Sequence, residues 1–365
     1  MMSKMFKLRN INKHPFAYLV NNMHTQINLL QDSGFRQLEA ILGPSISQCL
    51  TSNFGNILKG KQIIFNNGET RLVPINGWHI RNKYSRDSVI TFQPLKENTT
   101  VLAIDSSSIQ IAETEEGALY AVKCGIATAF QGQTYAHFKI GPMLFYLSED
   151  TLKHSELDHR IAKLILFDSE AAKRLIRIRI ERGIQLELSR CLSGSILLID
   201  GSLRASVFEH TNQTLRKVVE NCSLNKNVIV GISKSTKLKI LDKISLPLTK
   251  INSPGFIDVD LIIKSLVRNT IGDSVLLKIG SRDNSPILRA DIVTPDGDKV
   301  RSFGIMLWND SIARGYPETL QLAHHISTFT GTEISCIKSH VLNKYNVKEL
   351  ASEDIRKKLL GSILT

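Results

Sequence analysis

The sequence has few aromatic residues, no paired cysteines and no long apolar run. Phe, Trp and Tyr make up 6% of the 365 residues, so we expect a core built mainly from Ile, Leu and Val. The five cysteines stand singly, which argues against a disulfide framework and against structural zinc. No apolar run approaches the roughly 18 residues of a membrane span, and the first residues lack the apolar segment of a secretory signal. We therefore expect a globular cytoplasmic protein.

The chain carries a large positive charge. The formal net charge at pH 7 is +12. A positive field attracts polyanions, and nucleic acid is the commonest polyanion in a cell. A lysine-rich proteome would produce the same excess, so the charge favours a nucleic-acid partner without establishing one.

The pattern along the chain predicts three regions. Residues 1–95 combine apolar residues at helical spacing with a segment containing Asn-Gly, which predicts a helical and hairpin extension for dimer or partner contacts. In residues 96–345 an antiparallel meander is followed by alternating strands and helices, which predicts an α/β fold with a mixed sheet. Residues 346–365 are expected to form a C-terminal helical tail.

Two apolar segments run straight into an aspartate that is followed by small residues. "VLAIDSSS" contains Asp105, and "ILLIDGSLRAS" contains Asp200. If both aspartates end neighbouring strands, they lie at the edge where open α/β sheets bind ligands. Two carboxylates so close are unfavourable without a cation between them, and their oxygens suit Mg²⁺ or Mn²⁺. The alternative is that each aspartate caps a turn.

Other polar residues are candidates for the same site. The segment "RLIRIRIERGIQLELSR" offers Glu181 and Glu187 as a third carboxylate; spacing leaves both open, and each also has arginine neighbours for a solvated ion pair. Tyr316 and His324 stand eight residues apart, which predicts one side of one helix. There they would orient a phosphate or handle a proton, although packing is the commoner role of such a pair. Lys234 follows an apolar strand, where an ammonium would hold a phosphate.

Taken in order, these segments resemble the NurA family of archaeal nucleases that process DNA ends. "VLAIDSSS", "LLIDGSLRAS", "VIVGISKST" and "RGYPETLQLAHH" carry the resemblance, which spans residues 100–339. It implies an RNase H-like core, similar to Piwi and Argonaute nuclease domains, in a homodimer. It also implies manganese- or magnesium-dependent cleavage of single-stranded DNA and 5′–3′ exonuclease action in double-strand-break repair. The implied partner is a hexameric HerA-type helicase, and the implied location is the nucleoid.

The resemblance also assigns roles to individual residues. Those expected to act in catalysis are Asp105, Glu181, Asp200, Tyr316 and His324. Three of them are expected metal ligands, with Glu187 as an alternative to the glutamate: Asp105, Glu181 and Asp200. The basic residues expected to bind DNA are Lys234, Arg177, Arg179 and Arg204.

Two other functions remain open on the sequence alone. A chain that kept the fold without the chemistry would be a non-catalytic DNA-binding or clamp subunit of a helicase complex. A phosphotransferase using the same acidic residues is disfavoured, because the sequence has no GxxxxGK[ST] loop to cradle a nucleotide.

Overall fold

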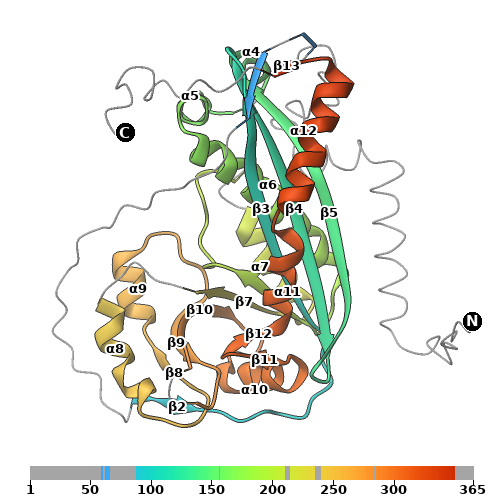
Figure 1. Cartoon of the computed structure of the whole chain (residues 1–365). Coiled ribbons are helices and arrows are strands. Elements are labelled where there is room, and N and C mark those ends of the chain that lie inside the picture. The colour runs from blue at the N-terminus through green and yellow to red at the C-terminus, as the bar shows by residue number, and fades with distance from the viewer. Residues whose placement is uncertain are drawn as a thin grey trace, which may run out of the picture.

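A computed structural model describes residues 59–60, 62–65, 88–155, 157–209, 214–234, 240–282 and 285–349. Its main feature is an eleven-stranded mixed sheet with helices on both faces (Figure 1). The helices predicted before residue 59, the Asn-Gly turn of the predicted hairpin and residues 350–365 of the predicted tail lie outside the described residues. The two boundaries between the three predicted regions stay predictions.

The elements have the following bounds. The central strands are β3 (Val101–Glu113), β4 (Gly117–Phe130), β5 (Gln133–Ser148), β6 (Ile196–Asp200), β7 (Val228–Ser233) and β10 (Ile287–Val293). The outer strands are β1 (Gln62–Phe65), β2 (Ile90–Thr91), β8 (Gly255–Asp258), β9 (Asp273–Lys278) and β13 (Lys348–Glu349), and a separate small hairpin is made by β11 (Ile312–Ala313) and β12 (Tyr316–Pro317). The helices are α4 (Glu149–Lys153), α5 (His159–Phe167), α6 (Ser169–Cys191), α7 (Thr214–Leu224), α8 (Ile240–Thr249), α9 (Asp260–Leu266), α10 (Lys299–Asn309), α11 (Glu318–Ser327) and α12 (Gly331–Tyr345).

The strand order gives the sheet its class. β3, β4 and β5 form an antiparallel meander, β6 pairs parallel to β3, and β7 pairs parallel to β6. The resulting order β5-β4-β3-β6-β7 is that of an RNase H-like core, with α6 and α7 in the connections that lead to the parallel strands. β10, β9, β8 and β2 extend it by antiparallel pairing. The α/β class and the RNase H-like mixed sheet predicted from the sequence are confirmed.

Alternation along the strands divides the core into two faces. Leu102 and Ile104 of β3 pack in the cluster that contains α6 and α7, whereas Val101 and Ala103 pack in the cluster that contains α10 and α11. β6 alternates in the same way, with Leu198 on the side of α11. In Figure 1, α11 and α12 run along the long strands β3–β5. The strand register therefore decides which helix each later polar side chain meets.

The helices before β6 also follow local chemistry. The chain forms two helices in this region, α5 and α6, which meet at Asp168. The carboxylate of Asp168 accepts a hydrogen bond from the N–H of Glu170 and so caps the start of α6. Among the helices of the described ranges, none combines the length and apolar character needed to cross a bilayer.

Candidate metal centre

Asp105 and Asp200 lie side by side where the pairing of β3 with β6 stops. The register ends at Ile104 opposite Ile199, so the two aspartates are the next residues on neighbouring strands. Asp200 is the last residue of β6, as predicted. The prediction that Asp105 also ends a strand was wrong: β3 continues to Glu113, because β4 pairs with it along nearly its whole length.

Strand parity turns both aspartates toward α11, where they meet His324. Nδ1 of His324 lies 2.7 Å from Oδ2 of Asp105. The hydroxyl of Ser327, one turn further along α11, donates to the same oxygen at 3.2 Å. The N–H of Ser106 donates to Oδ1 at 2.8 Å, so the Asp105 carboxylate is held at both oxygens. One possible ligand atom from each of Asp105, Asp200 and His324 lies within 4.8 Å of the others.

A glycine allows α11 to approach this closely. Gly125 of β4 lies opposite Asp105 in the register. A Cβ atom at this position would lie 2.2 Å from the carbonyl oxygen of Ala323 and 3.0 Å from Cβ of Ile326. Both neighbours belong to α11, so any larger residue would push away the helix that carries His324.

Lys234 and Tyr316 lie on the other side of Asp200. Nζ of Lys234 is 2.6 Å from Oδ2 of Asp200 and 5.5 Å from the centroid of the Tyr316 ring. The Tyr316 hydroxyl is buried near Asp200 and forms no hydrogen bond of regular geometry among the described residues. Burial, and then the negative charges of Asp200 and Asp105, raise its pKa, so the phenol stays protonated.

Tyr316 does not share a helix with His324, contrary to the sequence prediction. It lies in β12, and α11 begins only after Pro317, whose φ of −59° and ψ of 130° lie outside the helical region. Helical dihedrals are disfavoured for a residue that precedes proline, which explains why Tyr316 lies outside α11.

Glu181 lies next to this group but approaches from the opposite face of the sheet. The hydroxyl of Ser106 donates to its Oε2 at 2.6 Å, and Nε2 of Gln185 donates to its Oε1 at 3.0 Å. Ser106 follows Asp105 in β3 and therefore points the other way, toward α6. Burial raises the pKa of Glu181, and the positive charge of Arg182 opposes this shift. Glu187 is instead exposed and pairs with Arg190 at 2.8 Å, so of the two open glutamates only Glu181 adjoins the aspartates.

The sequence matches one family model, that of the NurA domain, over residues 99–328. The match covers more than half of the chain and includes Asp105, Glu181, Asp200, Tyr316 and His324. The chain belongs to the NurA family. This confirms the assignment made from the sequence segments, and with it the class of metal-dependent nuclease.

Solved structures of NurA proteins resemble the chain at low identity. The NurA nuclease from Sulfolobus solfataricus has 16% identity over 71% of this chain and 89% of its own, with a TM-score of 0.47. A NurA structure with manganese has 10% identity over 69% of this chain and 91% of its own, with a TM-score of 0.41. Endonuclease V from Bacillus subtilis has 12% identity over 71% and 89%, with a TM-score of 0.34. No curated protein matches the chain.

The basic residues predicted to bind DNA in this NurA chain divide into two kinds. Arg177 of α6 and Arg204 after β6 are exposed. Arg179 is buried, and its Nε donates to the carbonyl oxygen of Phe208 at 2.8 Å, so it holds a loop instead of facing a DNA strand. Sequence reasoning missed Arg174, whose guanidinium lies 5.8 Å from the Phe208 ring centroid. Burial, and then the charges of Arg177 and Arg204, lower its pKa.

The donor set of the NurA site fits a divalent cation. Two carboxylates and one imidazole converge. Each aspartate contacts a side chain from another element, His324 for Asp105 and Lys234 for Asp200, so neither serves only to cap a turn. Hard oxygen donors with one histidine and no thiolate suit Mn²⁺ or Mg²⁺. Compared with the ligands predicted from the sequence, the structure brings His324 into the group with the aspartates. It links Glu181 to Asp105 through Ser106, whose hydroxyl donates to Glu181 and whose N–H donates to Asp105.

Proposed function

We propose that the chain is a DNA nuclease whose metal centre is formed by Asp105, Asp200 and His324. The observation that carries this proposal is the convergence of their ligand atoms within 4.8 Å at the end of the β3–β6 pairing. These three residues would hold a divalent ion, which would supply a water of lowered pKa and neutralise charge that develops on the phosphate. Manganese is the preferred ion in the proposal, with magnesium as the alternative.

The neighbouring side chains would orient the phosphate. The His324 side chain is half exposed, so a substrate can reach the imidazole. The Lys234 ammonium is 44% exposed and already faces the charge of Asp200, where it would hold a phosphate oxygen. The ring of Tyr316 lies beneath that ammonium and fixes its position. Glu181 would tune the centre through Ser106.

The substrate is proposed to be single-stranded DNA, together with duplex ends resected in the 5′–3′ direction. Arg174, Arg177 and Arg204 form no ion pair with any residue that the structure describes. Arg174, Arg177 and Glu181 recur at helical spacing in α6, so a phosphate backbone that approaches the centre along this helix would pass both arginines. The net charge of +12 favours the same partner.

The assembly is also part of the proposal. We propose a homodimer that acts with a HerA-type hexameric helicase in double-strand-break repair at the nucleoid. Support comes from membership of the NurA family and from the resemblance of its four sequence segments. Co-purification with the helicase encoded by the same organism tests this part separately from the chemistry.

The experiment for the site uses end-labelled single-stranded and duplex DNA with Mn²⁺, Mg²⁺ or EDTA. Asp200→Asn removes charge from the centre with little change of shape, and we expect cleavage to fall at least about 100-fold. Asp296→Asn is the matched control, because this aspartate is exposed and its contacts in the described structure, an ion pair with Arg301 and a hydrogen bond from the N–H of Asp298, lie away from the site. Wild-type cleavage by Asp200→Asn would refute the site. DNA binding without metal, and without cleavage in Mn²⁺, would favour the non-catalytic clamp instead.

A further inference from the structure

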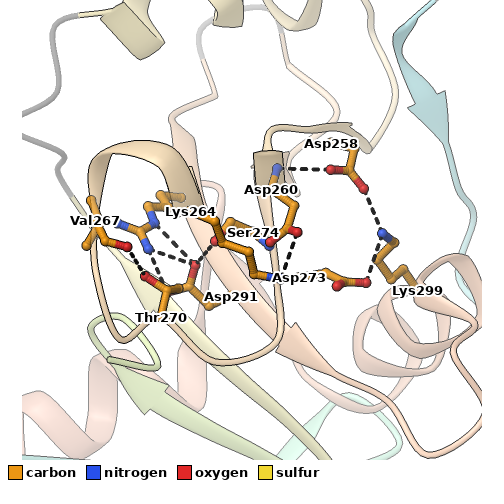
Figure 2. Close-up of polar contacts among 10 residues, drawn as sticks. Asp258, Asp260, Lys264, Val267, Thr270, Asp273, Ser274, Asp291 and Lys299 are labelled. Carbon is orange, nitrogen blue, oxygen red and sulfur yellow. Dashed lines mark hydrogen bonds and ion pairs between the residues drawn. The ribbon is translucent and has the colours of Figure 1, made fainter. Parts of the chain in front are cut away.

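A buried ion pair lies on the sheet face opposite the metal centre. Asp291 of β10 has no exposed surface, and Nη2 of Arg289 lies 3.0 Å from each of its carboxylate oxygens. Ser274 of β9 donates its hydroxyl to Oδ1 at 2.6 Å (Figure 2). Burying a carboxylate is unfavourable unless its oxygens are paired and hydrogen-bonded. Arg289 and Ser274 meet this requirement, which leaves one further bond of Asp291 to be explained.

That bond reaches the turn that follows Asp200. The N–H of Leu203 donates to Oδ2 of Asp291 at 3.0 Å, although the two residues stand 88 positions apart. Gly231 of β7 lies between them in the sheet, opposite Ile199 on one side and Asp291 on the other. A Cβ atom on Gly231 would lie 2.6 Å from the carbonyl oxygen of Gly201 and 3.0 Å from the Leu203 nitrogen. The glycine therefore lets the turn cross β7 and reach the carboxylate.

The same turn is bent and tied at other points. Gly201 has a φ of +117°, a conformation that favours glycine. Its N–H donates to the carbonyl oxygen of Ile232 at 2.9 Å, and the carbonyl oxygen of Leu203 accepts from Ile271 at 2.7 Å. Asp200 points toward α11, whereas Leu203 is buried in the cluster on the side of α6. The chain thus passes from one face of the sheet to the other between Asp200 and Leu203. Asp291 fixes the end of this turn through its hydrogen bond from the N–H of Leu203.

We propose that Asp291 is a positioning residue of the metal centre: by accepting the Leu203 N–H, it fixes the turn that aims the Asp200 carboxylate at Asp105 and His324. This inference rests on the proposed function. Asp291 is not itself a ligand, because it is fully buried and faces the other side of the sheet. Arg289 pairs with the same carboxylate at 3.0 Å and so holds it in place as an acceptor.

The test measures Mn²⁺ affinity directly, by the electron paramagnetic resonance signal of free Mn²⁺ in titrations of the full chain. Asp291→Asn keeps the shape of the side chain and removes its charge. We expect Mn²⁺ binding about 10-fold weaker, as for loss of an outer-shell partner of a ligand, and faster amide exchange in residues 201–209. Unchanged affinity would overturn the proposal, as would weaker binding with unchanged exchange.

A matched control separates positioning from general destabilisation. Asn227 is buried at the other end of the same strands, where its Oδ1 accepts from the N–H of Ser195 and its Nδ2 donates to the carbonyl oxygen of Leu192. Asn227→Ala is expected to lower the melting temperature without changing Mn²⁺ affinity. An equal loss of affinity in this control would overturn the specific role of Asp291.

Two further variants keep the outcome clear. If Asp291→Asn does not fold, Ser274→Ala removes one donor to the same carboxylate, and we expect Mn²⁺ binding about threefold weaker, in keeping with the net worth of one hydrogen bond; unchanged affinity would overturn the proposal. Asp200→Asn tests the proposed function itself. If it binds Mn²⁺ and cleaves DNA like the wild type, the centre is wrong; if it fails while Asp291→Asn binds normally, only the present inference is wrong.

Discussion

Replacing Gly125 with alanine tests the contact between α11 and the sheet. The added Cβ would lie 2.2 Å from the carbonyl oxygen of Ala323, whereas real Cβ atoms essentially never come closer than 3.0 Å to such an atom. The helix or the strand must therefore move by close to 1 Å. Both neighbours of the new atom lie in the turn of α11 that carries His324.

This shift is expected to lower the stability of the protein, whereas an ordinary glycine-to-alanine change raises it. Alanine at an unstrained position in a strand or helix stabilises a protein by about 0.4–1 kcal/mol, because it restricts the unfolded chain. Overpacking at Gly125 is expected to destabilise by about 1–3 kcal/mol instead. A displacement of about 1 Å also separates His324 from Asp105, which are 2.7 Å apart, and an error of this size in a catalytic group slows a reaction about 100-fold.

The assay combines thermal unfolding, Mn²⁺ titration and cleavage of labelled single-stranded DNA. Gly331→Ala is the matched control, because no atom lies within 4 Å of the added Cβ at the start of α12. We expect this control to keep the metal affinity and rate of the wild type and to be more stable than the wild type by about 0.4–1 kcal/mol. A Gly125→Ala protein with wild-type values in all three measurements would show that α11 does not lie against β4 as described.

Three further predictions follow from the geometry of the site. His324→Ala is expected to weaken Mn²⁺ binding about 10-fold or more, and unchanged affinity would remove His324 from the centre. Burial raises the pKa of Asp310 to about 7, so the folded state holds this proton more tightly than the unfolded state does. Its contribution to stability is then present below about pH 4 and lost as pH rises through 7; unfolding of Asp310→Asn should show a smaller loss over that range, and an unchanged slope would contradict the burial. Alanine at Arg174, Arg177 and Arg204 together should reduce the slope of log affinity for single-stranded DNA against log salt by about 2, and an unchanged slope would place the strand elsewhere.

Much of the core was predictable because alternation and helical spacing are local properties of a sequence. The meander, the strand that ends at Asp200 and the helix after Pro317 all follow from residues close together in the chain. The error at Asp105 has a non-local cause: whether a strand stops at a polar residue depends on its partner, and β4 continues to pair with β3 beyond it. Sequence spacing alone contains no information about that partner.

The arrangement of the polar side chains was harder to predict than their identity. Glu181 and His324 both adjoin Asp105, but strand parity sends Ser106 toward the glutamate and Asp105 toward the histidine. Arg179 and Arg177 stand in the same basic segment and cannot be told apart in the sequence. Only the burial of Arg179 shows that its side chain stabilises the fold. Asp291 stands in an unremarkable strand, and its link to Leu203 depends on three strands lying in register.

The central claim is that Asp105, Asp200 and His324 bind one divalent ion together. Crystals of the protein soaked in Mn²⁺, with data collected for manganese anomalous scattering, test it most directly. We expect an anomalous peak within coordination distance of all three side chains in the wild type, and no peak there in Asp200→Asn. A peak only at another position in the wild type, or an equal peak at this position in the variant, would contradict joint binding of the ion by these three residues.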